Sequence, residues 1–185
     1  MAQPRTAYIR AGDGYYLAGA PDNQDFNVAV SAALPRDTYF VLFCNSEWWQ
    51  DALDVVLKDT YAVRAARRYY TLQQPKIADW RDHIPEGYSM QPVDAELLAK
   101  GLENTESVMD WIVEEWMSVD AYLEQAFGFC LVHDADIVSW SLADYVSGDR
   151  CEIGITTAWE HRRHGFGTLA AAANAAHAIS LGSVS

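Results

Sequence analysis

A basic turn that contains two glycines lies near the end of the sequence, and its residue types suit a negatively charged ligand. The turn reads His161-Arg-Arg-His-Gly-Phe-Gly167, and it joins a segment with a strand-like pattern to an alanine-rich segment. Glycine lets the backbone approach a ligand closely, and the free N–H groups and dipole of a helix N-terminus favour a phosphate. We therefore expect this turn to bind an anion.

The segments on either side of the turn have the patterns of a strand and a helix. Before the turn, Ile153 and Ile155 fall on one face of a strand, and Glu152 and Thr156 fall on the other. After it, residues 168–181 are rich in alanine, the residue with the highest helix propensity. The turn is therefore expected where a strand ends and a helix begins.

Two further strands precede this one and run back and forth beside it. They are expected at residues 127–133 and 137–145, and short turns that contain Asp, Ser and Gly separate the strands. Strands joined by tight turns form an antiparallel meander. A strand at 88–92 and helices at 94–102 and 105–123 come before the meander. The second half of the chain therefore predicts a largely antiparallel sheet with flanking helices.

The first half of the chain has strand-like and helix-like segments of its own. It predicts a hairpin at residues 8–17, helices at 26–34 and 47–58, and strands at 38–44 and 63–72. Loop-forming residues between 73 and 87 mark a boundary. We therefore divide the chain into a small N-terminal α/β region, residues 1–85, and a second domain, residues 86–185.

The composition indicates a globular and strongly acidic protein. The 185 residues include 26 Asp and Glu against 13 Lys and Arg, for a net charge of −13. This balance disfavours a nucleic-acid partner and suits a cationic small molecule. No apolar run reaches the roughly 18 residues that a membrane span needs, and the three cysteines have the wide spacing of free thiols in a reducing compartment. We expect a cytoplasmic protein with no membrane partner.

The glycine turn also resembles two other kinds of site, and each lacks a required feature. Residues 165–170 fit the G-x-G-x-x-A pattern of a dinucleotide site, but residues 158–164 separate the first glycine from the strand. His161 and His164 have no third ligand at a suitable spacing, and the neighbouring arginines repel a cation, so we expect no metal. A plain strand-to-helix turn with arginines facing solvent is the alternative to a ligand site.

The turn and the order of elements before it resemble the GNAT superfamily of acetyl-CoA-dependent N-acetyltransferases. The superfamily signature, [RQ]-x-x-G-x-[GA], is met by Arg162-Arg-His-Gly-Phe-Gly167 after the third strand of the meander. The resemblance covers about residues 86–185 and implies an α/β fold of the α+β kind with a mixed, largely antiparallel GNAT-type sheet. Three segments are similar to the zwittermicin-resistance-type branch: Gly128-Phe-Cys130, Ile137-Val-Ser-Trp140 and Cys151-Glu-Ile-Gly-Ile-Thr-Thr157.

The resemblance implies transfer of an acetyl group from acetyl-CoA, as co-substrate, to the amine of a small molecule. It places the coenzyme pyrophosphate on the N–H groups of the turn, near the arginines, and the pantetheine arm along the preceding strand. The cofactor-binding residues so implied are Ile155, Thr157, Arg162, Arg163, His164, Gly165, Phe166, Gly167 and Thr168. Glu152 is implied as the catalytic residue, a general base that takes a proton from the amine.

The sequence ends at Gly182-Ser-Val-Ser185, where the superfamily continues with another strand. We expect either a shortened chain or a second chain that completes the sheet, such as the other copy in a homodimer, because an unpaired sheet edge is usually covered. The alternative function is a catalytically incomplete GNAT-like module that binds acyl-CoA or has a structural role.

Overall fold

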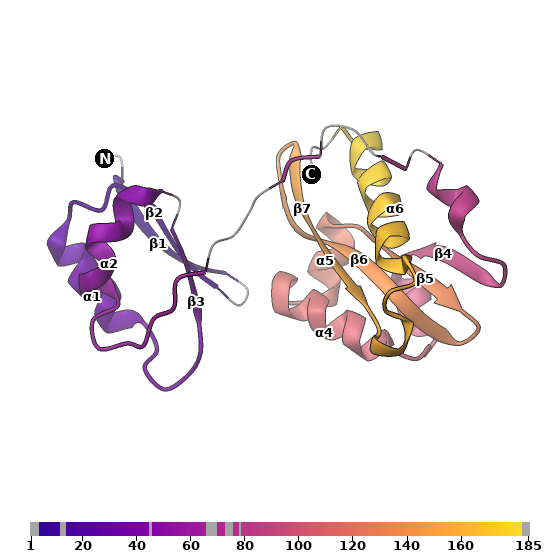
Figure 1. The fold of residues 1–185 in the computed structure, drawn as a ribbon, viewed down its shortest axis with the longest axis horizontal. Coiled ribbons are helices and arrows are strands. Elements are labelled where there is room, and N and C mark those ends of the chain that lie inside the picture. The colour runs from indigo at the N-terminus through magenta and orange to yellow at the C-terminus, as the bar shows by residue number, and fades with distance from the viewer. Residues whose placement is uncertain are drawn as a thin grey trace. The chain divides into compact units, whose positions relative to one another are not determined.

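The chain forms two compact units, Met1–Arg68 and Tyr69–Ser185, each with a hydrophobic core of its own (Figure 1). The computed structural model describes residues 4–11, 14–44, 46–65, 70–72, 76–77 and 79–182. Residues 79–85, which the sequence pattern groups with the first region, pack with the second unit. Trp80 is buried, and Ile84 contacts the core of the second unit beside Leu131 and Phe166.

In the first unit, two helices pack against a three-stranded sheet. Strands β1 (Thr6–Ala11) and β2 (Gly14–Gly19) are antiparallel, and β3 (Val41–Cys44) pairs with β2 in parallel. Helix α1 (Gln24–Ala33) follows β2, and the short 3₁₀ helix η1 (Glu47–Trp49) leads into α2 (Gln50–Val56). The buried core side chains are Leu17, Val30, Leu34, Trp49, Ala52 and Val56.

The strand expected over residues 63–72 is wrong in its described part. Residues 63–65 and 70–72 have no regular secondary structure, and residues 66–69 lie outside the described residues. The apolar and aromatic composition that suggested a strand is not sufficient, because a strand also needs a neighbour with which to form its ladder of hydrogen bonds. Among the described strands, none pairs with these residues.

The second unit contains four antiparallel strands in the order in which the chain makes them, β4-β5-β6-β7. Their bounds are Tyr88–Pro92, Gly128–His133, Asp136–Ser147 and Arg150–Thr157. A 3₁₀ helix, η2 (Trp80–His83), precedes β4, and a second one, η3 (Trp159–His161), follows β7. The meander expected from the sequence is therefore present, and β7 is an edge strand among the described elements.

Helices cover both faces of this sheet. Helices α3 (Ala95–Ala99), α4 (Thr105–Trp116) and α5 (Val119–Gln125) enclose one core, which contains Ile112 and Trp140. Helix α6 (Phe166–Ser180) packs on β5, β6 and β7 (Figure 1). Its Phe166 side chain lies against Leu131 and Val138. Buried alanines along α6, such as Ala170, let the helix approach the strands closely.

The long helix expected over residues 105–123 is two helices, α4 and α5. Met117 ends α4 in the left-handed region with φ 65°. Ser118 then caps α5, and its side chain accepts a hydrogen bond from the N–H of Ala121. The sequence contains this signal, because serine is a preferred N-cap residue.

The α+β class expected from the sequence is confirmed. The sheet of the second unit is antiparallel, and the β2–β3 pair of the first unit contributes the parallel part of a mixed topology. In the part of the chain that the structure describes, no helix combines the length and the apolar character needed to cross a membrane.

Candidate functional site

The glycine turn leads directly into α6 and leaves several backbone donors free. Gly165 is the N-cap of α6 with φ 84°, a left-handed conformation that favours glycine. Within the described residues, the backbone N–H groups from Arg163 to Gly167 donate to no protein acceptor. Thr168 differs, because its N–H donates to the carbonyl of Gly165 at 3.0 Å. The free donors therefore run from residue 163 to residue 167 and do not include Thr168, the last of the implied cofactor-binding residues.

The two glycines of the turn have different surroundings. A Cβ atom at Gly165 would meet no atom within 4 Å, so the space in front of this residue is open. A Cβ atom at Gly167 would lie 3.1 Å from Oγ1 of Thr157 and 3.4 Å from Cγ2 of Ile155. Gly165 thus leaves room for a ligand, and Gly167 allows close packing of the helix on β7.

A hydrogen-bonded group holds the turn to Asp136, the first residue of β6. Nε2 of His161 lies 2.9 Å from Oδ2 of Asp136, and the side-chain N–H of Asn104 donates to Oδ1 of the same carboxylate at 2.8 Å. His164 stacks on Phe166, the first residue of α6. His161 is therefore engaged by a carboxylate, and among the described residues no group of three or more metal-binding side chains is present.

The open edge of β7 continues the row of free backbone groups beside the turn. The N–H of Ala158 donates to Val138 of β6 at 3.0 Å, and successive residues of a strand direct their backbone groups to opposite sides. Gly154 and Thr156 therefore face β6, as their carbonyl contacts with serine hydroxyls of β6 also indicate. Ile155 and Thr157 present their backbone groups to the open edge.

The two arginines of the turn lie in different environments. The Nε–H of Arg162 donates to the carbonyl of Thr157 at 3.1 Å, and its guanidinium lies 4.8 Å from the ring centre of Trp159. Arg162 therefore holds the turn and covers one backbone acceptor of the β7 edge. Arg163 has φ 69°, is exposed, and forms no ion pair with an acidic group among the described residues. Its charge is available to an anion.

Glu152 lies at the other end of β7 with other carboxylates near it. The residue is exposed and pairs with Tyr145 of β6. Asp144, which precedes Tyr145 in β6, is close enough for the negative charge of Glu152 to raise its pKa. Glu115 of α4 also faces Asp144. The structure thus brings Glu152 near Asp144, which the sequence patterns did not single out.

The Asp144 carboxyl group has a pKa raised to about 7. Burial is the largest cause, and the neighbouring charges of Glu115 and Glu152 add to it. A hydrogen bond from Nε1 of Trp111 to Oδ1, 3.0 Å long, acts in the opposite direction because it stabilises the ionised form. One sequence signal could have identified this residue, since Asp144 is a lone acid in an otherwise apolar and hydroxyl-bearing strand segment.

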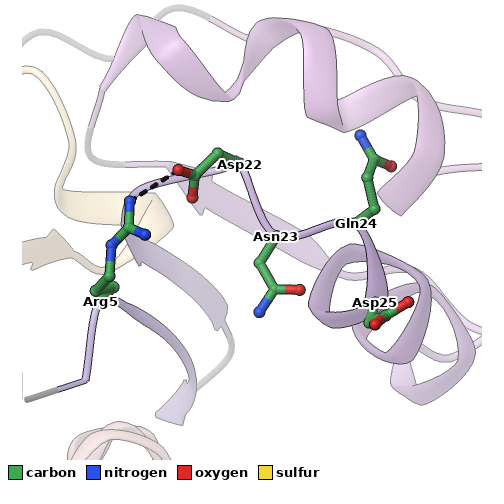
Figure 2. Close-up of a pocket in the computed structure, with 5 residues that line it drawn as sticks. All are labelled: Arg5, Asp22, Asn23, Gln24 and Asp25. Carbon is green, nitrogen blue, oxygen red and sulfur yellow. Dashed lines mark hydrogen bonds and ion pairs between the residues drawn. The ribbon is translucent and has the colours of Figure 1, made fainter. Parts of the chain in front are cut away.

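A surface hollow in the first unit has a structural explanation. Figure 2 shows its lining side chains, which lie around the start of α1. Arg5 forms an ion pair with Asp22 at 2.8 Å, and the side chain of Asn23 caps α1 by accepting a hydrogen bond from the N–H of Phe26. These polar groups therefore hold β1 and α1 in place.

Comparison with known proteins relates the chain to acetyltransferases. The model of a family described as GNAT acetyltransferase matches residues 1–184, which includes the first unit. An uncharacterized N-acetyltransferase of Bacillus subtilis (strain 168), YdfB, is 27% identical over 164 residues, which are 86% of this chain and 61% of that protein. The crystal structure of a GCN5-related N-acetyltransferase-like protein from Streptococcus suis 89/1591 matches with a TM-score of 0.72 and 20% identity, over 98% of this chain and 72% of that one. The chain thus spans about three fifths of the length of the curated relative it matches.

Proposed function

Because the chain belongs to the GNAT acetyltransferase family, we propose that it is an N-acetyltransferase that transfers the acetyl group of acetyl-CoA to the amine of a small molecule. The observation that carries the proposal is the row of free backbone donors from Arg163 to Gly167 at the start of α6, beside the open edge of β7. Such a row of N–H donors can bind a phosphate. Such a strand edge can pair with an extended chain that carries amide groups.

The residues of the turn fit the coenzyme. The N–H groups of residues 163–167 would hold the pyrophosphate, and Gly165 leaves the space that it needs. The free guanidinium of Arg163 adds positive charge in a chain whose net charge is −13. His164 and Phe166 stack on each other and fix the start of the helix. Arg162 holds the turn to β7, because its Nε–H donates to the carbonyl of Thr157.

The edge of β7 would hold the pantetheine arm. Ile155 and Thr157 direct their backbone groups away from β6, so both can pair with the amides of an extended ligand. The carbonyl of Thr157 already accepts from Arg162, which leaves its N–H and both backbone groups of Ile155. When bound, acetyl-CoA supplies the activated acetyl group.

We propose that Glu152 is the carboxylate that interacts with the acceptor amine. An amine is protonated at neutral pH and has to lose a proton before its nitrogen can act as a nucleophile. Glu152 is exposed on the same strand as Ile155, so it can attract an ammonium group to the reacting end of the site and accept its proton. Among the family, we place the chain with the zwittermicin-resistance-type branch, with a small-molecule amine as acceptor and the cytoplasm as its location.

Titration calorimetry with acetyl-CoA and with NAD tests the site. We expect heat from acetyl-CoA and none from NAD, and we expect Gly165→Trp to abolish binding because the indole fills the open space of the turn. Gly148→Trp is a matched control, since Gly148 also has positive φ and open space, in the turn between β6 and β7. Heat from NAD alone, or equal loss of binding in both variants, would contradict the proposal.

Release of free thiol from acetyl-CoA tests the reaction itself. We expect a panel of small primary amines to accelerate the release, with the acetylated amine detected by mass spectrometry. A folded protein that binds acetyl-CoA and transfers acetyl to none of the amines would instead support the acyl-CoA-binding module. A homodimer that covers the open edge of the sheet is a further proposal, which sedimentation analysis checks.

A further inference from the structure

A β-bulge in β6 gives Asp144 a position that no regular strand residue would have. Ala143 pairs with Ile153 and Tyr145 pairs with Glu152, so Asp144 is an extra residue without a partner on β7. Bulges of this kind redirect a side chain and are frequent near active sites. Trp116 fixes the bulge, because its Nε1 donates to the carbonyl of Ala143 at 2.9 Å.

The Asp144 side chain lies on the face of the sheet that α4 covers, the same face as Trp140 and Leu142. The indole of Trp111, in α4, donates to its Oδ1. Opposite, β7 carries a glycine, and a Cβ atom at Gly154 would collide with both the Asp144 carboxylate and the Trp111 ring. The missing side chain of Gly154 therefore creates the recess that Asp144 and Trp111 occupy, and Asp144 is only partly buried there.

The charges around the recess are suited to a cation. Glu115 from α4 and Glu152 from β7 both face Asp144, and within the described residues no Lys, Arg or His forms an ion pair with Asp144 or Glu152. From α5, the fully buried hydroxyl of Tyr122 has no hydrogen-bond partner in the described part of the chain. It lies on the same face, beside Leu142, and interacts with the Asp144 charge.

We propose that Asp144 takes the proton from the ammonium group of the acceptor while Glu152 holds that group at the mouth of the recess. The inference rests on the proposed function and refines the role of Glu152. In this step one N–H bond of the ammonium breaks and one O–H bond forms on the Asp144 carboxylate. The products are a neutral amine with a free electron pair and a neutral carboxylic acid, so charge and atoms balance.

The geometry favours Asp144 over Glu152 for the proton. Glu152 is exposed to water, whereas Asp144 is partly buried, and the negative charges of Glu115 and Glu152 disfavour its ionised form. A group that binds its proton near neutral pH matches the requirement of a general base better than an ordinary carboxylate. The Trp111 indole holds Oδ1, which leaves Oδ2 as the oxygen for the proton.

NMR of the carboxyl carbons in the free protein tests the inference without any turnover. The Asp144 signal is assigned by its loss in Asp144→Asn, a variant whose amide oxygen can still accept from Trp111. We expect its titration midpoint near pH 7, and we expect n-butylammonium to lower that midpoint by about half a pH unit or more. Tetramethylammonium, which carries the same charge but has no N–H to donate, should lower it less. A midpoint below pH ~5, or the same response to both cations, would overturn the proposal.

The Glu152→Gln variant and steady-state kinetics distinguish the role of Asp144 from that of Glu152. Together with acetyl-CoA binding, they also test the role of Asp144 separately from the proposed function. Glu152→Gln should lower the Asp144 midpoint, because it removes a neighbouring negative charge, and should raise KM for the amine. Asp144→Asn should instead lower kcat by about 10²-fold or more and flatten its pH profile near neutrality, with acetyl-CoA affinity unchanged. Failure of the wild type to bind acetyl-CoA would contradict the proposed function, whereas the n-butylammonium response decides the role of Asp144 separately.

Discussion

Asp144 couples the stability of the second unit to pH. Its pKa is raised in the folded protein from the ordinary 3.8 to about 7, so the folded state binds a proton that the unfolded state has released. The stabilising contribution of this proton is complete below pH ~4 and is lost as the pH rises towards 7. The sign is opposite to that of an aspartate in an ion pair.

Asp144→Asn should therefore remove a pH-dependent part of the unfolding free energy. Relative to wild type, the variant should be more stable at pH 8 than at pH 5, by about 1–2 kcal/mol after allowance for partial exposure to solvent. Urea unfolding of both proteins at the two pH values measures this difference. A variant whose relative stability is the same at both values would show that Asp144 titrates as an ordinary carboxylate.

Gly154→Ala tests whether the recess depends on a missing side chain. The new methyl group would collide with Asp144 and Trp111, so we expect a loss of about 1–3 kcal/mol in unfolding free energy. Gly148→Ala is the control at an open position, where positive φ alone should cost about 1 kcal/mol. The recess would be roomier than described if the alanine at 154 cost less than the alanine at 148 in urea unfolding.

Among the elements, α6 is fixed to the sheet by a buried chain of hydrogen bonds. The side-chain N–H of Asn174 donates to Oγ of Ser141 in β6 at 3.0 Å, and that hydroxyl donates to the carbonyl of Gly154 in β7 at 3.0 Å. Both side chains are completely buried, where unpaired polar groups are costly. These hydrogen bonds therefore hold together the helix and both strands that form the site.

Removal of either side chain should destabilise the second unit. We expect Asn174→Ala and Ser141→Ala each to cost about 1–3 kcal/mol, and the double variant to cost clearly less than the sum because the partners depend on each other. Urea unfolding of the four proteins gives the coupling energy. Additive losses would mean that the two side chains act independently.

The sequence predicted the elements of the site better than the contacts between them. Alternation of apolar residues marked the strand that is β7, short turns marked the limits of the three meander strands, and the alanine-rich segment after Gly167 is α6. The bulge at Asp144 could not be predicted, because the register shift appears only in the pairing of β6 with β7. The recess depends on Trp111 and Gly154 meeting across the sheet, which only tertiary packing decides.

At the level of the whole molecule, every residue of the candidate site lies in the second unit. The first unit has a separate core, in which Leu17 is buried. Leu17→Ala should destabilise that unit by about 2–5 kcal/mol and leave acetyl-CoA affinity unchanged. Val138→Ala, beneath α6, should weaken both stability and affinity. Urea unfolding measures the stability of each variant, and calorimetric titration of the folded variant measures its affinity for acetyl-CoA. Loss of affinity in Leu17→Ala would show that the first unit supports the coenzyme site.

The free backbone donors of the turn are the central claim, and amide chemical shifts measure them directly. In ¹H–¹⁵N spectra, addition of acetyl-CoA should produce its largest changes at the N–H groups of Gly165, Phe166 and Gly167, with smaller ones at Ile155 and Thr157. Gly165→Trp should suppress these changes, and Gly148→Trp should preserve them. Shifts of amides elsewhere in the folded chain on addition of acetyl-CoA, with those at the start of α6 unchanged, would contradict a coenzyme site at this turn.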